Sequence, residues 1–189
     1  MTEILLFHHA QGLTPGVRAF ADRLRSAGHT VHTPDLFDGR TFGDVESGVA
    51  HAQQLGFDQV LARGVAAADE LPAELVYAGF SMGVMPAQKL TQTRPGSVGA
   101  LFYDSCLPVS EFGQWPEGVP VQIHGGTDDE WFAEDLEAAR ALADSTPAAE
   151  LFLYTGTAHL FADSSLDAYD PAAARLVLER TLSFLESLS

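Results

Sequence analysis

The chain has 189 residues, of which 26 are acidic and 10 are basic, so that the formal net charge is −16, and 46% of the residues are hydrophobic. This length suits one globular domain with a large core, which we predict to span residues 1–189. The negative charge argues against binding to nucleic acid or anionic membranes, and the apolar content argues against disorder.

Cys106 is the only cysteine, which excludes an intramolecular disulfide and a cysteine-based zinc cluster. It lies outside any catalytic motif, and we expect it to be a partly buried structural thiol. The first residues lead directly into a strand-like run without the basic flank of a signal peptide, and no apolar run approaches the ~20 residues of a membrane span. We therefore expect a cytoplasmic monomer or homodimer whose partner is a small-molecule substrate.

Short apolar runs alternate along the chain with longer segments of helical spacing, a pattern typical of a mostly parallel sheet with helices on both faces. The predicted strands cover residues 4–8, 30–33, 75–78, 100–103, 121–124 and 151–154. Helical spacing occurs over residues 17–24, 84–91 and 132–143, and in a last helix that follows Asp170 and Pro171 as N-cap and first helical residue. The sequence therefore predicts an α/β fold without a large cap domain.

Two segments are less regular. Residues 42–71 are rich in alanine but contain Gly56 and Gly64, so they form either two helices or one helix weakened at the glycines. Residues 104–120 contain prolines and glycines without a clear period, which predicts a long loop after a strand. Loops of this length usually cover something or carry function.

The most informative motif is Gly79-Phe80-Ser81-Met82-Gly83, which follows a predicted strand and precedes a predicted helix. G-x-S-x-G in this context is a strained strand-to-helix turn that lifts the serine hydroxyl above the sheet, and its glycines avoid collisions with the neighbouring strand and helix. The backbone N–H of Met82 would then point toward developing negative charge at a helix N-terminus.

A serine nucleophile needs a histidine base and an acid that orients it, and hydrolases with this turn carry them in the chain order serine, acid, histidine. The strand at residues 121–124 runs into Gly125-Gly126-Thr127-Asp128, and the strand at 151–154 runs into a loop that ends at His159. Three successive strand ends thus offer Ser81, Asp128 and His159 in the required order.

The sequence separates Asp128 only weakly from its neighbour Asp129. We favour Asp128 because it comes first after the glycine turn, whereas Asp129 is expected to face solvent or to cap the helix that starts near Glu130. The second oxyanion donor is expected in the loop after the first strand, and we nominate the backbone N–H of Ala10.

The remaining histidines are weaker candidates for the base. His29, His32 and His51 precede the serine and are expected on solvated surfaces, and His124 is expected to lie within a strand as a core residue.

Four segments together resemble one known family, in matching order from about residue 5 to residue 161. They are Gly79–Gly83, Pro34-Asp35-Leu36-Phe37-Asp38-Gly39, Gly125-Gly126-Thr127-Asp128 and Ala158-His159-Leu160-Phe161. The chain resembles the dienelactone hydrolase family of α/β-hydrolases. The resemblance implies a single-domain α/β-hydrolase fold, a triad of Ser81, Asp128 and His159, and no metal or organic cofactor.

The sequence departs from that family at three positions. Dienelactone hydrolases proper use a cysteine nucleophile, so Ser81 resembles a serine branch of the family. They place a glutamate in the loop after the first strand, where this chain has His9. Asp163 stands where the namesake enzymes carry an arginine four residues after the catalytic histidine, and we expect it to repel a substrate carboxylate.

These observations support a serine hydrolase that cleaves a small ester, lactone or thioester through an acyl-enzyme intermediate. Ser81 attacks the carbonyl, His159 transfers the proton, Asp128 orients His159, and the N–H groups of Met82 and Ala10 stabilise the oxyanion.

Five residues near the predicted triad in the sequence are expected to line the substrate pocket: His9, Gln11, Trp115, Trp131 and Phe161. Two other functions remain open. The first is a non-catalytic small-molecule binding protein on the same fold. The second is a metal-dependent hydrolase using His8 and His9, which we disfavour because adjacent residues at a strand end point to opposite sides.

Overall fold

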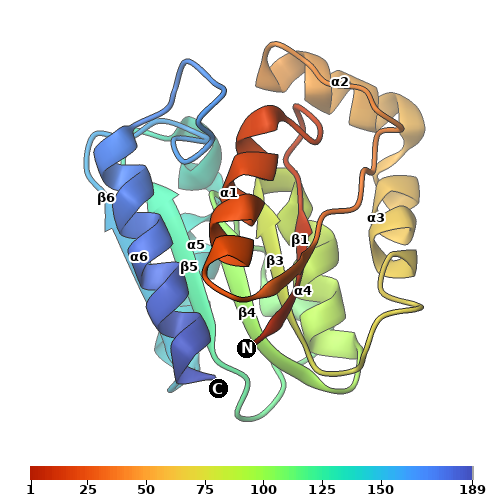
Figure 1. Ribbon diagram of the computed structural model, residues 1–189, viewed down its shortest axis with the longest axis vertical. Coiled ribbons are helices and arrows are strands. Elements are labelled where there is room, and N and C mark those ends of the chain that lie inside the picture. The colour runs from red at the N-terminus through yellow and green to blue at the C-terminus, as the bar shows by residue number, and fades with distance from the viewer. Residues whose placement is uncertain (189) are drawn as a thin grey trace.

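Six parallel strands form one sheet in the computed structural model of the protein, which describes residues 1–188 (Figure 1). The order of the strands across the sheet is β2-β1-β3-β4-β5-β6. The strands are β1 (Glu3–Phe7), β2 (Thr30–His32), β3 (Leu75–Phe80), β4 (Ser97–Tyr103), β5 (Val121–Gly126) and β6 (Ala149–Tyr154). All six predicted strands are thus confirmed, although their ends differ by up to three residues, and β3 and β5 each run two residues farther than predicted.

Six α-helices accompany these strands within the described residues. They are α1 (Pro15–Ser26), α2 (Val45–Leu55), α3 (Phe57–Ala66), α4 (Val84–Thr93), α5 (Glu130–Ser145) and α6 (Pro171–Ser187). The predicted start of the last helix is confirmed, because Pro171 begins α6 and the Asp170 carboxylate accepts from the backbone N–H groups of Ala172 and Ala173. The predicted loop of residues 104–120 contains only a short 3-10 helix, Val109–Glu111.

The alanine-rich segment forms two helices, α2 and α3, which meet at Gly56. Gly56 has φ +89°, a left-handed conformation that ends α2 and that other residues rarely adopt. Gly64 does not interrupt α3. A side chain there would collide with the ring of Pro86, so the glycine lets α3 pack closely on α4.

Alternate residues of each buried strand point to opposite faces of the sheet, which gives the protein two cores. Ile4 and Leu6 of β1 pack with α1 and α6, whereas Leu5 and Phe7 pack with α3, α4 and α5 on the other face. Figure 1 shows α1 and α6 together on one side of the sheet. The resulting three layers confirm the α/β fold with helices on both faces.

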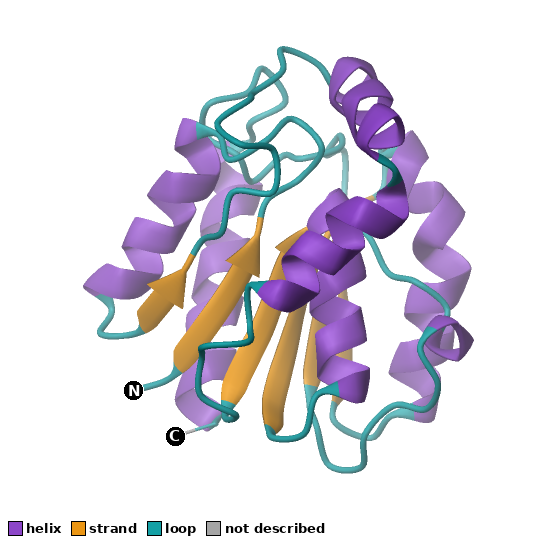
Figure 2. Ribbon diagram, turned by 90° about the vertical axis from the view of Figure 1, so that its right-hand side faces the viewer, coloured by secondary structure: helices purple, strands orange, loops and turns teal. Residues whose placement is uncertain are grey.

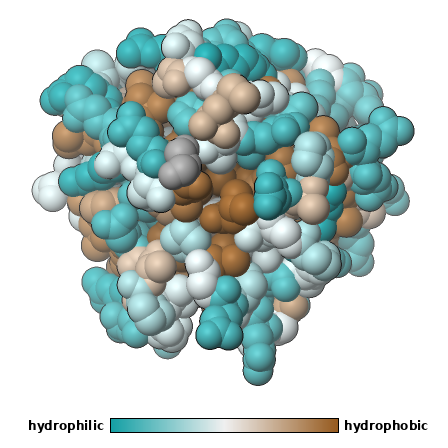
Figure 3. Space-filling model, turned by 60° about the horizontal axis from the view of Figure 1, so that its bottom comes forward, coloured by the Kyte–Doolittle hydropathy of each residue, from teal (hydrophilic) through white to brown (hydrophobic). Residues whose placement is uncertain are grey.

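The loops that follow the strands gather at the carboxyl end of the sheet, together with α2 (Figure 2). Strand order reverses direction between β1 and β3, and such a switch point is where open α/β sheets bind ligands. Figure 3 views the molecule from the opposite end, where hydrophilic side chains surround a hydrophobic area near the centre. None of the helices within residues 1–188 combines the length and apolar character that crossing a membrane requires.

Candidate active site

Ser81 lies at the turn between β3 and α4, where the chain is held in an uncommon conformation. Its φ is +48°, in the left-handed region that non-glycine residues rarely occupy. A side chain on Gly79 would collide with the backbone of Gly83, and one on Gly83 would lie 2.6 Å from the carbonyl oxygens of Phe7 and His8. The two glycines therefore allow the tight turn and bring it against the end of β1, as the motif predicted.

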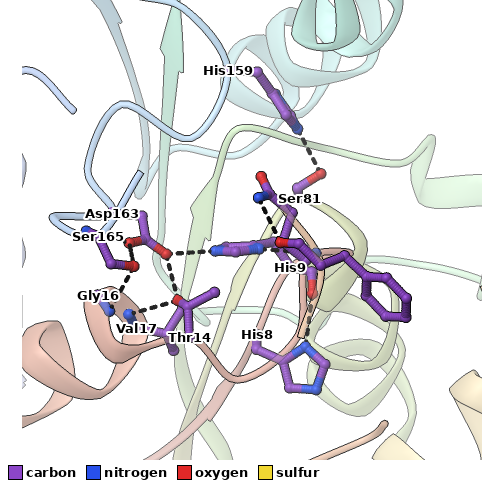
Figure 4. A network of polar contacts seen from close by, with 11 residues as sticks. His8, His9, Thr14, Gly16, Val17, Ser81, His159, Asp163 and Ser165 are labelled. Atoms are coloured by element: carbon purple, nitrogen blue, oxygen red, sulfur yellow. Dashed lines mark hydrogen bonds and ion pairs between the residues drawn. The ribbon is translucent and has the colours of Figure 1, made fainter. Parts of the chain in front are cut away.

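The side chain of His159 reaches Ser81 from the loop after β6. The distance from Ser81 Oγ to His159 Nε2 is 2.9 Å, and the two residues are joined in Figure 4. This contact links residues 78 positions apart in the chain. A serine hydroxyl can therefore donate its proton directly to an imidazole nitrogen at this site.

The carboxylate that contacts His159 belongs to Asp129, not to Asp128, so the predicted position of the acid is wrong by one residue. His159 Nδ1 donates to Asp129 Oδ2 over 2.7 Å, and the Asp129 side chain is fully buried. Asp128 is exposed, and within residues 1–188 its carboxylate accepts only from the Thr127 hydroxyl.

The reason lies in the geometry after β5. Because β5 continues through Gly126, residues 127 and 128 form the turn, and the N–H of Asp128 donates to the carbonyl of Thr157. Asp129 then begins α5, where its Oδ1 accepts from the N–H groups of Trp131 and Phe132. The expectation that Asp129 caps a helix is confirmed, but the cap uses one oxygen and leaves Oδ2 free for His159.

His159 is surrounded by negative charge. Burial alone would lower its pKa, but the hydrogen bond that His159 donates to Asp129 and the charges of Asp104, Asp129 and Asp135 outweigh burial and raise the pKa above its ordinary value. These carboxylates thus stabilise the protonated imidazole, as a proton-transferring histidine requires.

Asp104 is a buried carboxyl beside this histidine that the sequence analysis did not single out. It follows β4 directly, adopts φ +59°, and neither of its carboxylate oxygens makes a hydrogen bond of good geometry among the described residues. Burial and the neighbouring Asp129 charge raise its pKa to about 7, against the opposing effects of His159 and of the nearby backbone N–H of Leu160. The available sequence signal was its place at a strand end, the same signal that led to Asp128 and His159.

The predicted oxyanion donors lie on the two segments that Gly83 brings together. Met82 is in the first turn after Ser81, and Ala10 is in the turn after β1. The N–H of the next residue, Gln11, is taken by the ring of His9, whereas no hydrogen bond among residues 1–188 uses the N–H of Ala10. The Ala10 N–H is therefore available to a ligand.

His159, but not Ser81, lines a cleft of about 520 Å³ that lies beside the proposed triad. Its lining includes Gln11, the start of α2 and the loop of residues 165–168, and its charged side chains besides His159 are the acidic Asp44, Glu46 and Asp167. Lysine and arginine are absent from the described residues that line it.

The five predicted pocket residues are placed in different parts of the protein. Gln11 lines the cleft with His159, and Trp131 lies beside His159 with ring centroids 6.0 Å apart. Phe161 instead packs in the core against Tyr154, so its predicted pocket role is wrong. Trp115 packs on Phe102 and lines a separate groove that contains neither Ser81 nor His159, so that prediction is wrong too.

His9 is also misassigned as a pocket residue, because its side chain is fully buried and bound to Asp163. Asp163 itself is 2% exposed and hydrogen-bonded within the protein. The expectation that it repels a substrate carboxylate therefore fails, since its charge is satisfied inside the fold.

Three other residues considered in the sequence analysis are buried within the protein. Cys106 is buried, and burial followed by the nearby Asp135 raises the pKa of its thiol to about 12. His124 is buried in the core and hydrogen-bonded to the Tyr154 hydroxyl. The ring of His8 accepts the N–H of Leu36, and its pKa falls to about 4, chiefly because of burial.

The described residues contain no group of three or more histidine, cysteine or acidic side chains arranged to hold a metal ion. The rings of His8 and His9 both have partners within the protein, so they do not form a shared site.

Comparisons with known proteins agree with this architecture. A carboxymethylenebutenolidase from Rhodococcus opacus is 27% identical over 210 aligned positions, which cover 97% of this chain and 80% of the relative. A probable 2-oxo-3-(5-oxofuran-2-ylidene)propanoate lactonase from Bradyrhizobium is 27% identical over 162 positions, which cover 79% of this chain and 60% of the relative.

Among solved structures, a dienelactone hydrolase-like promiscuous phosphotriesterase from metagenomic libraries has the same fold. Its TM-score is 0.75 at 16% identity, with 100% of this chain and 87% of the other covered. The sequence profile of the dienelactone hydrolase family matches residues 1–189. With the G-x-S-x-G turn, the parallel sheet and the full-length match in agreement, the chain belongs to the dienelactone hydrolase family.

Proposed function

We propose that the protein is a serine hydrolase that cleaves a small ester, lactone or thioester through an acyl-enzyme intermediate. The observation that carries the proposal is an unbroken chain of hydrogen bonds, in which Ser81 donates to His159 over 2.9 Å and His159 donates to Asp129 over 2.7 Å. A buried acid, an imidazole and a hydroxyl in this order are the parts that activate a serine.

The first half of the reaction forms the acyl-enzyme. Ser81 Oγ attacks the substrate carbonyl while His159 Nε2 takes the hydroxyl proton, and Asp129 stabilises the resulting imidazolium. The carbonyl electrons move to the oxygen, where the N–H groups of Met82 and Ala10 donate to the oxyanion. Collapse of this intermediate breaks the bond to the leaving group, which receives the proton from His159.

The second half regenerates the serine. His159 takes a proton from water, whose oxygen attacks the acyl carbon and forms a second oxyanion. When this intermediate collapses, the bond to Ser81 breaks and the serine recovers its proton from His159. The products are a carboxylic acid and the alcohol or thiol released in the first half, so no external oxidant or reductant takes part.

The charge of the cleft favours an uncharged substrate. Its lining carries Asp44, Glu46 and Asp167 and, among the described residues, no basic side chain that would bind a carboxylate. The Bradyrhizobium relative is named for a propanoate, whereas an anionic substrate would meet like charge here. We therefore propose a neutral ester or lactone small enough for the cleft of about 520 Å³.

The test is the hydrolysis of p-nitrophenyl esters of graded acyl length by the wild type and by Ser81→Ala. We expect turnover by the wild type and a loss of about 10⁴-fold or more in kcat for the variant. If the two proteins behave alike across the series, the proposed function fails, and the alternative of a non-catalytic small-molecule binding protein is favoured instead.

A further inference from the structure

A second buried histidine–aspartate pair lies next to the proposed triad. His9 Nε2 is 2.7 Å from Asp163 Oδ2, and the two side chains are 0% and 1% exposed. The other ring nitrogen, His9 Nδ1, accepts the backbone N–H of Gln11 over 3.2 Å. The ring hydrogen therefore resides on Nε2 and is donated to Asp163 (Figure 4).

Asp163 is the centre of a network that is closed within the protein. Its Oδ2 also accepts from the Thr14 hydroxyl, and its Oδ1 accepts from the N–H and the hydroxyl of Ser165. Burial opposes ionisation, but these bonds, with the bond from His9 the strongest, hold the pKa of Asp163 below its ordinary value. Asp163 is thus a buried carboxylate anion with four donors.

The start of α1 is shaped to receive this carboxylate. Thr14 is the N-cap of α1, where its hydroxyl oxygen accepts the N–H of Val17 while its O–H donates to Asp163. A side chain on Gly16 would collide with Asp163 Oδ1, so only glycine leaves room for the anion there. The positive end of the 12-residue helix adds a favourable interaction with the charge.

The pair joins the two loops that carry reacting groups in the proposed mechanism. His9 immediately precedes Ala10, and the hydrogen bond from Gln11 to the His9 ring fixes the turn that leaves the Ala10 N–H unpaired. Asp163 follows His159 by four positions, and its own N–H closes a turn onto the carbonyl of Leu160. The contact from His9 to Asp163 spans 154 positions in the sequence.

We propose that His9 and Asp163 are positioning residues, which hold the oxyanion-binding turn after β1 at a fixed distance from the loop of His159. The inference rests on the proposed function, because it assigns the pair to that reaction. A buried polar pair of this kind contributes little to stability compared with apolar residues of the same volume, but it specifies one geometry. Small displacements of reacting groups are costly, since a misplacement of about 1 Å can lower a rate about 100-fold.

The experiment compares three variants of the full-length protein: Asp163→Asn, His9→Leu and His9→Gln. Asp163→Asn removes the negative charge and replaces one of the two accepting oxygens, each of which faces two donors, by a donating NH2 group. His9→Leu removes the ring that donates to Asp163, whereas a glutamine side chain can still donate an amide N–H to Asp163. Thr181→Val is the matched control, because it removes a buried hydrogen bond, between Tyr103 and Thr181, outside the proposed machinery. For each protein, kcat and KM are measured with the same p-nitrophenyl ester at least ~10 °C below the variant's own Tm, after Tm has been recorded.

We expect Asp163→Asn and His9→Leu to lower kcat by roughly 10- to 100-fold with KM changed by less than about 3-fold, because a displaced oxyanion donor acts on the transition state. His9→Gln is expected to recover a measurable part of kcat, and Thr181→Val to lower Tm while kcat stays unchanged. Should His9→Leu fail to fold, the nearly isosteric Asp163→Asn decides the question.

If Asp163→Asn has a lower Tm but the same kcat as the wild type, the inference is overturned. The proposed function would still stand in that case, provided that turnover by the wild type depends on Ser81. Absence of Ser81-dependent turnover in the wild type would instead overturn the proposed function and this inference with it.

Discussion

Replacing Asp129 and, separately, Asp128 distinguishes which of these two neighbouring carboxylates orients His159. Asp129→Asn keeps the shape of the side chain, and an amide oxygen can still accept from the N–H groups of Trp131 and Phe132 as Oδ1 does now. The amide nitrogen then faces His159 Nδ1 in place of Oδ2. Since that nitrogen donates, Nδ1 must accept, and the ring hydrogen moves to Nε2, where it points at the Ser81 hydroxyl.

The expected magnitude follows from this tautomer. With a hydrogen on Nε2, His159 cannot accept the serine proton, and an Asp→Asn change of this kind in a serine protease lowers kcat about 10⁴-fold. We expect a loss of roughly 10³- to 10⁴-fold here, equivalent to about 4 to 5.5 kcal/mol in the activation free energy. The helix cap survives, because asparagine is as good an N-cap as aspartate, so Tm should fall by only a few degrees.

The matched control is Asp128→Asn. Asp128 is exposed and its carboxylate accepts from the Thr127 hydroxyl, so this change should leave kcat within about 2-fold and stability within about 0.5 kcal/mol. The assay is steady-state hydrolysis of one p-nitrophenyl ester by both variants and the wild type, with thermal unfolding of each. A large loss for Asp128→Asn together with near wild-type turnover for Asp129→Asn would refute the reasoning.

Three further predictions concern pH, packing and charge. Asp135→Asn removes a negative charge that raises the pKa of His159, so the acidic limb of the kcat/KM profile should move to lower pH. The profile is recorded from about pH 5 to about pH 8, and a limb that stays in place or moves upward would contradict this. Gly83→Ala places a methyl group 2.6 Å from two carbonyl oxygens of the β1 end and should cost about 1 to 3 kcal/mol, read as a lower Tm, whereas Gly43→Ala, in open space, should leave Tm nearly unchanged. An ester with a terminal carboxylate should show up to about 10-fold lower kcat/KM than its neutral isostere at low salt, because of the acidic cleft, and the difference should shrink as salt is added; equal rates at low salt would contradict the assignment.

The fold could be predicted largely because its signals are local. Most of the strands are short apolar runs, and the breaks at Gly56 and at Asp170–Pro171 are encoded by the residues themselves. The serine turn is equally local, since Gly79 and Gly83 are needed within five residues of chain. The sequence left open only whether residues 42–71 form one helix or two, and Gly56 at positive φ decides for two.

The errors arise where the outcome depends on tertiary distances. The choice between Asp128 and Asp129 depends on how far β5 continues, which is set by its pairing with β6 through Gly126. Phe161 follows His159 closely in sequence, but the left-handed Leu160, at φ +61°, lies between them and Phe161 packs in the core.

The pairing of His9 with Asp163 could not be predicted, because the two positions carry no pattern that links residues 154 apart. Both residues stand at positions where the sequence departs from the family pattern. The resemblance led us to expect that Asp163 would meet the substrate, and its burial rules this out.

The central claim is that Ser81 is an activated nucleophile. The most direct measurement is mass spectrometry of the intact protein and its peptides after incubation with a fluorophosphonate, for the wild type, Ser81→Ala and Asp129→Asn. The account predicts one adduct per wild-type chain, located on Ser81, none on Ser81→Ala, and much slower labelling of Asp129→Asn. A wild-type protein that stays unlabelled, or that carries its adduct on another residue, would contradict it.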